Sequence, residues 1–182
     1  MLGNAAFTDD FPVGTRVLFF DLDTAITKGW GPLAKVPLDK PVFLRDLWGA
    51  SRPASGVMSW EVSDRLSAIW RDFESQAQNR PPYDHPSARS GIDGLTWDIR
   101  TDEQWLHHYL LPDKWAAWQD LLPGHFLSYK YDIMRQMRVN GNFRGPLTAE
   151  EAQAAGVVYF HGRPRPHEVV HSWNPFSRGV IL

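Results

Sequence analysis

The apolar residues of this chain gather in short runs, and the clearest of them constrains the fold most. Residues 16–20, Arg-Val-Leu-Phe-Phe, follow Gly14 and stop at Asp21. The length of the run and its β-branched and aromatic residues predict a buried strand. A strand that is apolar on both faces is typical of a covered parallel sheet. No segment approaches the ~18 consecutive apolar residues of a membrane span, so none is expected.

Further short strands and helices alternate along the chain. Strands are expected at 41–45, 56–60, 126–130 and 157–161. Helices are expected from Ser63 to about Gln78, over 103–110, within 112–125 and from Thr148. Loops are expected at 28–40, 49–55 and 79–100. This alternation favours an α/β fold, and a length of 182 residues without a boundary indicates a single domain over 1–182.

Composition excludes several function classes. There is no cysteine, and therefore no disulfide, thiolate metal site or cysteine nucleophile. A net charge of −2 offers no general reason to bind nucleic acid. The first residues, MLGNAAFTDDF, lack the basic start and the apolar run of a secretory signal, so we expect a cytoplasmic protein. Nine tryptophans suit either a packed core or a pocket that stacks flat faces such as sugars.

Two aspartates follow the first strand. Asp21 and Asp23 are two residues apart, and in an extended chain such side chains point to the same side. Two carboxylates there suit Mg²⁺ or Mn²⁺ with coordination positions left for phosphate. At the carboxyl end of a strand in an α/β sheet, this is where ligands bind. The alternative is a loop that begins with two solvated aspartates.

A second group of polar residues follows the last predicted strand. His161 ends the strand, Gly162 lets the backbone approach a ligand, and Arg163 and Arg165 come next. A neutral imidazole binds Mn²⁺, and the guanidinium group matches phosphate oxygens. The alternative is a basic surface turn.

Three smaller motifs complete the candidate residues. Ser55 and Gly56 form a small-residue turn that lets a substrate come close, or a plain tight turn. Arg45-Asp46 directly follows a predicted strand, and could be an acceptor site or ordinary surface. Asp102-Glu103 stands at a predicted helix start, where an acidic residue often serves only as a cap.

These motifs occur in an order that resembles a known family. They are Val-Leu-Phe-Phe-Asp-Leu-Asp-Thr, Leu-Arg-Asp, Ser-Gly-Val-Met-Ser-Trp, Asp-Glu-Gln-Trp and Phe-His-Gly-Arg-Pro-Arg-Pro. The chain resembles the GT-A glycosyltransferases related to glycogenin and the bacterial lipopolysaccharide galactosyltransferases, and more closely a bacterial and phage group with this motif order. The resemblance covers roughly residues 11–170. It implies a Rossmann-like GT-A domain, with a mixed sheet flanked by helices.

The resemblance also implies an activity: metal-dependent transfer of a sugar from a nucleotide-diphosphate donor, typically a uridine diphosphate (UDP) sugar. The acceptor would be a glycan, a lipid-linked sugar or a protein. By resemblance, the cation Mn²⁺ or Mg²⁺ is held by Asp21, Asp23 and His161, and the donor phosphates are bound by Gly162, Arg163 and Arg165. The sugar is contacted by Arg45 and Asp46, and its pocket is lined by Ser55 and Gly56. The resemblance places Asp102 and Glu103 near the reacting carbon.

The chain departs from the family pattern at several positions. Ala54 replaces an asparagine, Glu103 a glutamine, and Tyr159 stands where the metal-binding histidine often lies. Arg165-Pro166-His167 replaces Lys-Pro-Trp. Only twenty residues precede Asp21, where the family has several strands and helices that bind the nucleoside. We therefore expect the C-terminal portion of a GT-A fold, with an exposed apolar edge that favours self-association.

Two other functions fit part of the pattern. A haloacid-dehalogenase-like phosphatase would use Asp21 as nucleophile and Asp23 as acid, but it also needs a later acidic pair. The only adjacent aspartates, Asp9-Asp10, precede the motif. The other alternative is a degenerate, non-catalytic binding module that keeps the fold without turnover, which the short N-terminus and Ala54 favour.

Overall fold

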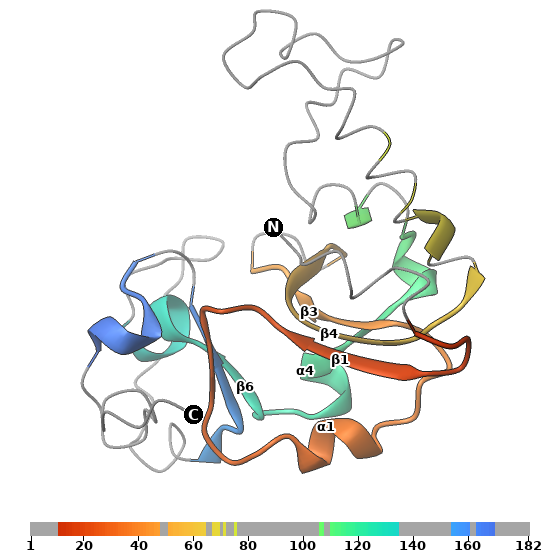
Figure 1. Cartoon of the computed structure of the whole chain (residues 1–182). Helices are drawn as coiled ribbons and strands as arrows, with labels where there is room; N and C mark the ends of the chain where they lie inside the picture. Colours follow the sequence, from red (N-terminus) through yellow and green to blue (C-terminus); the bar gives the residue numbers. More distant parts are fainter. Residues whose placement is uncertain are drawn as a thin grey trace, which may run out of the picture.

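The chain is a mixed α/β protein with two mixed sheets and few helices over the residues described in the computed structural model (Figure 1). These residues are 11–47, 51–64, 67–69, 71, 75, 106–107, 110–134, 154–160 and 163–169. In those segments, no helix is both long and apolar enough to cross a bilayer.

The first sheet has four strands in the order β1-β4-β3-β5. They are β1 (Arg16–Phe20), β4 (Pro53–Glu61), β3 (Val42–Arg45) and β5 (Ala116–Ala117). β1 and β3 each pair antiparallel with β4, whereas β5 is parallel to β3. The expected parallel pairing of β1 is therefore wrong. Because β1, β3 and β5 run in one direction, they end at the same edge, where β4 begins.

The second sheet has three strands in the order β2-β7-β6. They are β2 (Thr24–Ile26), β7 (Val157–Tyr159) and β6 (Phe126–Ser128). β7 is parallel to β6 and antiparallel to β2, with Thr24 opposite Tyr159. The start of β2 therefore lies beside the end of β7. Since only Asp21, Leu22 and Asp23 separate β1 from β2, the aspartates lie where the chain passes between sheets.

The two sheets share a central core because successive strand residues face opposite sides. In β3, Val42 and Leu44 enter the central cluster, while Phe43 enters a second cluster on the other face. The buried members of the central cluster are Leu33, Val36, Val42, Leu44, Val57, Trp118, Phe126, Val157 and Tyr159. A third cluster lies on the far side of the second sheet and includes Val158 of β7 and Phe160, which follows this strand. Apolar residues at successive positions are thus needed because both faces are covered.

A short helix occupies the segment that we predict as a loop at 28–40. Helix α1 spans Gly31–Lys35, and Leu33 is its buried residue. The Arg16 guanidinium on β1 donates to the carbonyl oxygens of Leu33 and Ala34, both at 2.7 Å. These carbonyl groups lie near the C-terminus of the helix. A positive charge is stabilising there because the helix dipole places partial negative charge at that end. The sequence of 28–40 does not indicate this helix, because the support comes from Arg16 of β1, which lies outside that segment.

Other boundaries shift by a few residues. Strand β4 begins at Pro53, inside the segment 49–55 that we predict as a loop. Strand β6 ends at Ser128, because the chain turns into η5 (Tyr129–Ile133). The turn is held by the Asp132 carboxylate, which accepts from the Ser128 amide at 2.6 Å. The helix expected within 112–125 is confirmed as α4 (Trp118–Leu121), and the short helix η4 (Pro112–Lys114) precedes it.

The helices expected from Ser63 and over 103–110 are seen only in part. Described positions 64, 67–69, 71, 75 and 106–107 are helical, and the Ser67 amide donates to the Ser63 carbonyl at 3.0 Å. The helix start expected at Thr148 lies outside the described residues.

Gly156 lies against the His125 ring, and we expect Gly156→Ala to destabilise the fold by ~1–3 kcal/mol. A Cβ at position 156 would come within 1.9 Å of a ring carbon of His125. Moving the His125 ring would cost free energy, because the ring packs on Phe126 and its Nε2 atom is buried. Thermal unfolding measures the effect.

The matched control is Gly31→Ala, where a Cβ meets nothing within 4 Å. This control should leave the melting temperature unchanged or slightly raised. Adding His125→Ala to Gly156→Ala should recover part of the loss, because the clashing ring is removed. Equal melting temperatures for Gly156→Ala and the wild type would contradict this packing.

Candidate functional site

The two aspartates belong to a tight turn rather than to an extended segment. The Thr24 amide donates to the Asp21 carbonyl at 3.0 Å and closes the turn. The Asp21 carboxylate accepts from the Leu22 amide at 2.8 Å. The argument that both carboxylates point the same way along a strand is therefore wrong, because the chain leaves one sheet for the other here. Asp21 is exposed, whereas the Asp23 side chain is only 14% exposed.

The start of β4 lies directly against this turn. The Gly56 carbonyl accepts from the Asp21 amide at 2.9 Å and from the Thr24 hydroxyl at 3.3 Å. On its other side, a Cβ at Gly56 would touch Leu44 of β3 at 3.4 Å. The Ser55-Gly56 pair thus lies within strand β4, between the end of β1 and the end of β3, and the turn predicted at these two residues is wrong.

The end of β7 and the segment after it also reach the turn. The Phe160 amide donates to the Asp23 carbonyl at 2.9 Å. Farther along the chain, the Arg165 guanidinium forms an ion pair with the Asp23 carboxylate, with 2.9 Å between Nη1 and Oδ2. Two segments that are far apart in sequence therefore meet at one carboxylate.

Arg165 belongs to a short turn that a glutamate holds together. The turn ends in η6 (Pro166–Glu168). The Arg165 amide donates to the Glu168 carboxylate at 2.7 Å, and the Glu168 amide donates to the Arg165 carbonyl at 2.9 Å. Arg163 pairs with the same carboxylate at 3.2 Å, although its own side chain is 87% exposed. The hydrogen bond from Arg165 and the nearby positive charges lower the pKa of Glu168.

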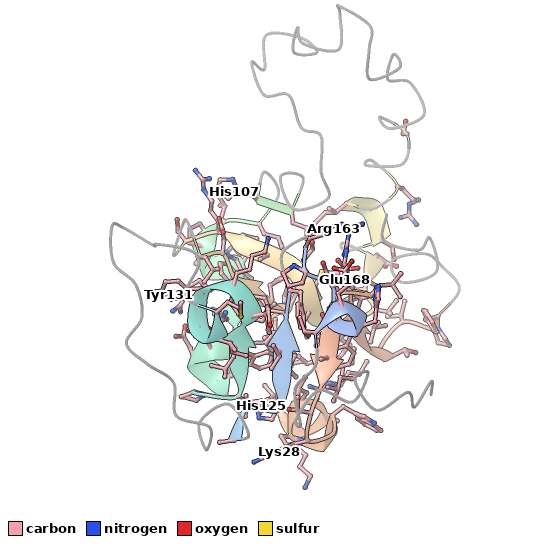
Figure 2. All side chains as sticks on the ribbon, turned by 90° about the vertical axis from the view of Figure 1, so that its left-hand side faces the viewer. Lys28, His107, His125, Tyr131, Arg163 and Glu168 are labelled. Carbon is pink, nitrogen blue, oxygen red and sulfur yellow. The ribbon has the colours of Figure 1, made fainter. Side chains whose placement is uncertain are left out.

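Figure 2 shows Arg163 and Glu168 close together, at the end of the molecule opposite His125 and Lys28. At that opposite end, burial first and the charge of Lys28 second lower the pKa of His125. His125 is therefore a packing residue in its neutral form, in contact with Phe126.

Arg45 is fixed at the end of β3 by helix α4. The Arg45 amide donates to the Gln119 side-chain oxygen at 2.9 Å, and the Gln119 side-chain amide donates back to the Arg45 carbonyl at 3.4 Å. The Arg45 guanidinium pairs with Asp120. Asp46 begins the connection to β4, where its amide donates to the Arg52 carbonyl at 3.0 Å.

Tyr159 links strand β7 of the second sheet to helix α4, and sequence reasoning does not assign it this role. Its hydroxyl makes a hydrogen bond with Gln119. Burial raises the pKa of Tyr159, the charges of Asp132 and Asp46 raise it further, and the bond to Gln119 opposes them. Tyr159 is therefore a neutral hydrogen-bonding group in this structure. The alternation of β7 could have indicated its inward position, but not its partner.

The structure gathers most of the predicted site residues that it describes at one edge. Around the ends of β1, β3 and β7 lie Asp21, Asp23, Arg45, Asp46, Ser55, Gly56 and Arg165. Arg163 is in the same turn as Arg165, but it forms an ion pair with Glu168. The remaining candidates, His161, Gly162, Asp102 and Glu103, lie outside the described residues.

The chemistry of the gathered groups suits a hard cation. Asp21 and Asp23 supply carboxylate oxygens, the donors that Mg²⁺ and Mn²⁺ accept while keeping water or phosphate ligands. Among the described residues there is no group of three or more histidine, aspartate or glutamate side chains that could hold a metal. The third expected ligand, His161, is not among those residues. The described part of the expected site therefore consists of two carboxylates in one turn, of which Asp23 is paired with Arg165.

Comparison with known proteins adds no family: no family model and no curated protein matches this chain.

Proposed function

We propose that this chain is a GT-A-type, metal-dependent glycosyltransferase that moves a sugar from a nucleotide-diphosphate donor, a UDP sugar, to an acceptor. The observation that carries the proposal is the meeting of the Asp21–Asp23 turn with Arg165. The motifs that resemble the glycosyltransferases are spread from Asp21 to Arg165, and such a meeting is what a diphosphate–cation site needs. Arg45 and Asp46, at the neighbouring strand end, add polar groups for a sugar.

Each group has a distinct role in the proposed reaction. Asp21 and Asp23, with His161, would hold Mn²⁺ or Mg²⁺, which when bound neutralises charge that develops on the leaving diphosphate. Arg165 binds phosphate oxygens through its planar guanidinium group. Gly162 and Arg163 belong to the same phosphate-binding segment.

The sugar is recognised at the adjacent strand ends. Arg45 and Asp46 bind its hydroxyl groups, while Ser55 and Gly56 leave room for the ring. By resemblance to the glycosyltransferases, Asp102 and Glu103, which are outside the described residues, would act near the reacting carbon. The acceptor is a glycan, a lipid-linked sugar or a protein, and we propose a cytoplasmic location for the reaction. Strand β1 is an outer strand of the first sheet as described, and pairing of this outer strand with a second copy offers a route to self-association.

Calorimetric titration with UDP, with and without Mn²⁺, tests the proposal. We expect micromolar binding that requires Mn²⁺, and slow release of UDP when a UDP sugar is supplied. A folded sample that binds neither UDP nor another nucleoside diphosphate contradicts the proposal. Binding without any transfer or hydrolysis favours a non-catalytic module, and rapid hydrolysis of a small phosphate ester favours the phosphatase.

A further inference from the structure

The ion pair between Arg165 and Asp23 carries an inference that rests on the proposed function and extends it. We propose that Arg165 is an internal counter-ion, which occupies the Asp23 carboxylate until a cation and a diphosphate arrive together. The site then discriminates against the cation alone. Cation and nucleotide bind with positive coupling, because the nucleotide gives the displaced arginine a new partner.

The carboxylate in this contact is fixed in place. Its side chain is 14% exposed, and its backbone carbonyl accepts from the Phe160 amide at 2.9 Å. Charges that are partly removed from water interact more strongly than exposed ones. A cation that binds Asp23 must therefore either share the carboxylate with the guanidinium at 2.9 Å or displace it. Sharing places two positive groups against one anion, so displacement is favoured.

The Arg165 side chain can change its conformation while the Arg165 backbone stays in place. The Arg165 amide and carbonyl are both bonded to Glu168, and the next residue, Pro166, is buried. The Arg165 side chain is nevertheless 47% exposed. Its guanidinium can therefore rotate towards solvent while the turn stays in place. Arg163 pairs with Glu168 at 3.2 Å, so the two arginines have separate partners.

A diphosphate offsets the free energy that is lost when a cation displaces the Arg165 guanidinium from the Asp23 carboxylate. Phosphate oxygens accept guanidinium hydrogen bonds in the fork geometry that carboxylates also accept. With the cation alone, Arg165 exchanges its carboxylate for water, but with the cation and a diphosphate it exchanges one anion for another. By linkage, the nucleotide strengthens cation binding by the same factor by which the cation strengthens nucleotide binding. The direct bond between cation and phosphate adds to this coupling, so the test must isolate the arginine.

The experiment compares Mn²⁺ binding to wild type, Arg165→Gln and Arg163→Gln in the absence of nucleotide, with free Mn²⁺ measured by electron paramagnetic resonance. We expect Arg165→Gln to bind Mn²⁺ alone about 10-fold more tightly, within the usual range of such couplings. At saturating Mn²⁺, the same variant should bind UDP about 10-fold more weakly, since a phosphate-binding group is lost. Arg163→Gln removes the same charge two positions away and should change the Mn²⁺ affinity less than about 2-fold, as expected for an exposed ion pair.

The outcomes separate this inference from the proposed function. If wild type binds Mn²⁺ and UDP but Arg165→Gln binds Mn²⁺ no more tightly, the counter-ion role is overturned and the glycosyltransferase proposal stands. An equal gain in Arg163→Gln also overturns it, because the effect is then general electrostatics. Absence of Mn²⁺ binding in every protein, with or without UDP, overturns both. Arg165→Lys, which keeps the charge, should bind Mn²⁺ alone as weakly as wild type. If Arg165→Gln fails to fold, Arg165→Met removes the charge in its place, and the same gain of about 10-fold is expected.

Discussion

Replacing Asp23 by asparagine is expected to weaken Mn²⁺-dependent UDP binding by about 100-fold, or about 2.7 kcal/mol. The substitution keeps the shape of the side chain but removes the negative charge that holds the cation. Losses of ~2–5 kcal/mol are usual when one partner of a desolvated charged contact is removed. The Asp23 side chain is 14% exposed, so little water replaces it. Calorimetry with UDP at saturating Mn²⁺ measures the change.

The control is Asp39→Asn, which removes the same charge from an exposed residue. Asp39 precedes the amino end of β3, whereas the candidate site lies at the carboxyl end of that strand. We expect UDP affinity within about 2-fold of wild type for this variant, as for exposed charges in general. An Asp23→Asn protein that is folded and binds UDP with Mn²⁺ as wild type does would remove Asp23 from the site.

Replacing Trp118 by alanine is expected to destabilise the protein by ~3–5 kcal/mol, the usual cost of deleting a fully buried indole. Trp118 is 0% exposed and stacks on Phe126 of β6, with 5.5 Å between ring centroids. It therefore joins helix α4 to the second sheet across the central core. Gln119 and Asp120, the next residues of α4, hold Arg45 at the end of β3. Loss of the Trp118 indole should therefore also weaken the contacts of Gln119 and Asp120 that position Arg45.

Thermal unfolding of Trp118→Ala should show a midpoint lowered by about 10 °C for a chain of this size. Trp118→Phe keeps the stacked ring and should lose far less. Its cost is reduced further because the indole Nε1 is buried without a hydrogen-bond partner among the described residues. Leu121→Ala, at an exposed position of the same helix, is the matched control. Equal losses for Trp118→Ala and Leu121→Ala would contradict the anchoring role.

The site could be predicted only in outline. Asp21 and Asp23 at a strand end, and Ser55-Gly56 beside a second strand, are local patterns, and the structure brings them together. The ion pair that joins Asp23 to Arg165 links positions 142 apart in the sequence. The bond between Arg45 and Gln119 spans 74 positions. No local pattern encodes such a partner, because side-chain pairing depends on how the sheets pack.

Sequence by itself determined where β1, β3 and β7 lie, because short apolar runs rich in β-branched and aromatic residues favour buried strands. It also determined that polar groups follow those strands. Only the tertiary structure decided that β1 pairs antiparallel with β4, that Arg16 supports α1, and that Tyr159 reaches Gln119. The physical reason is that strand direction, the support of a helix and a buried hydrogen bond each depend on an interaction between two residues. Such residues come into contact only when the chain has folded.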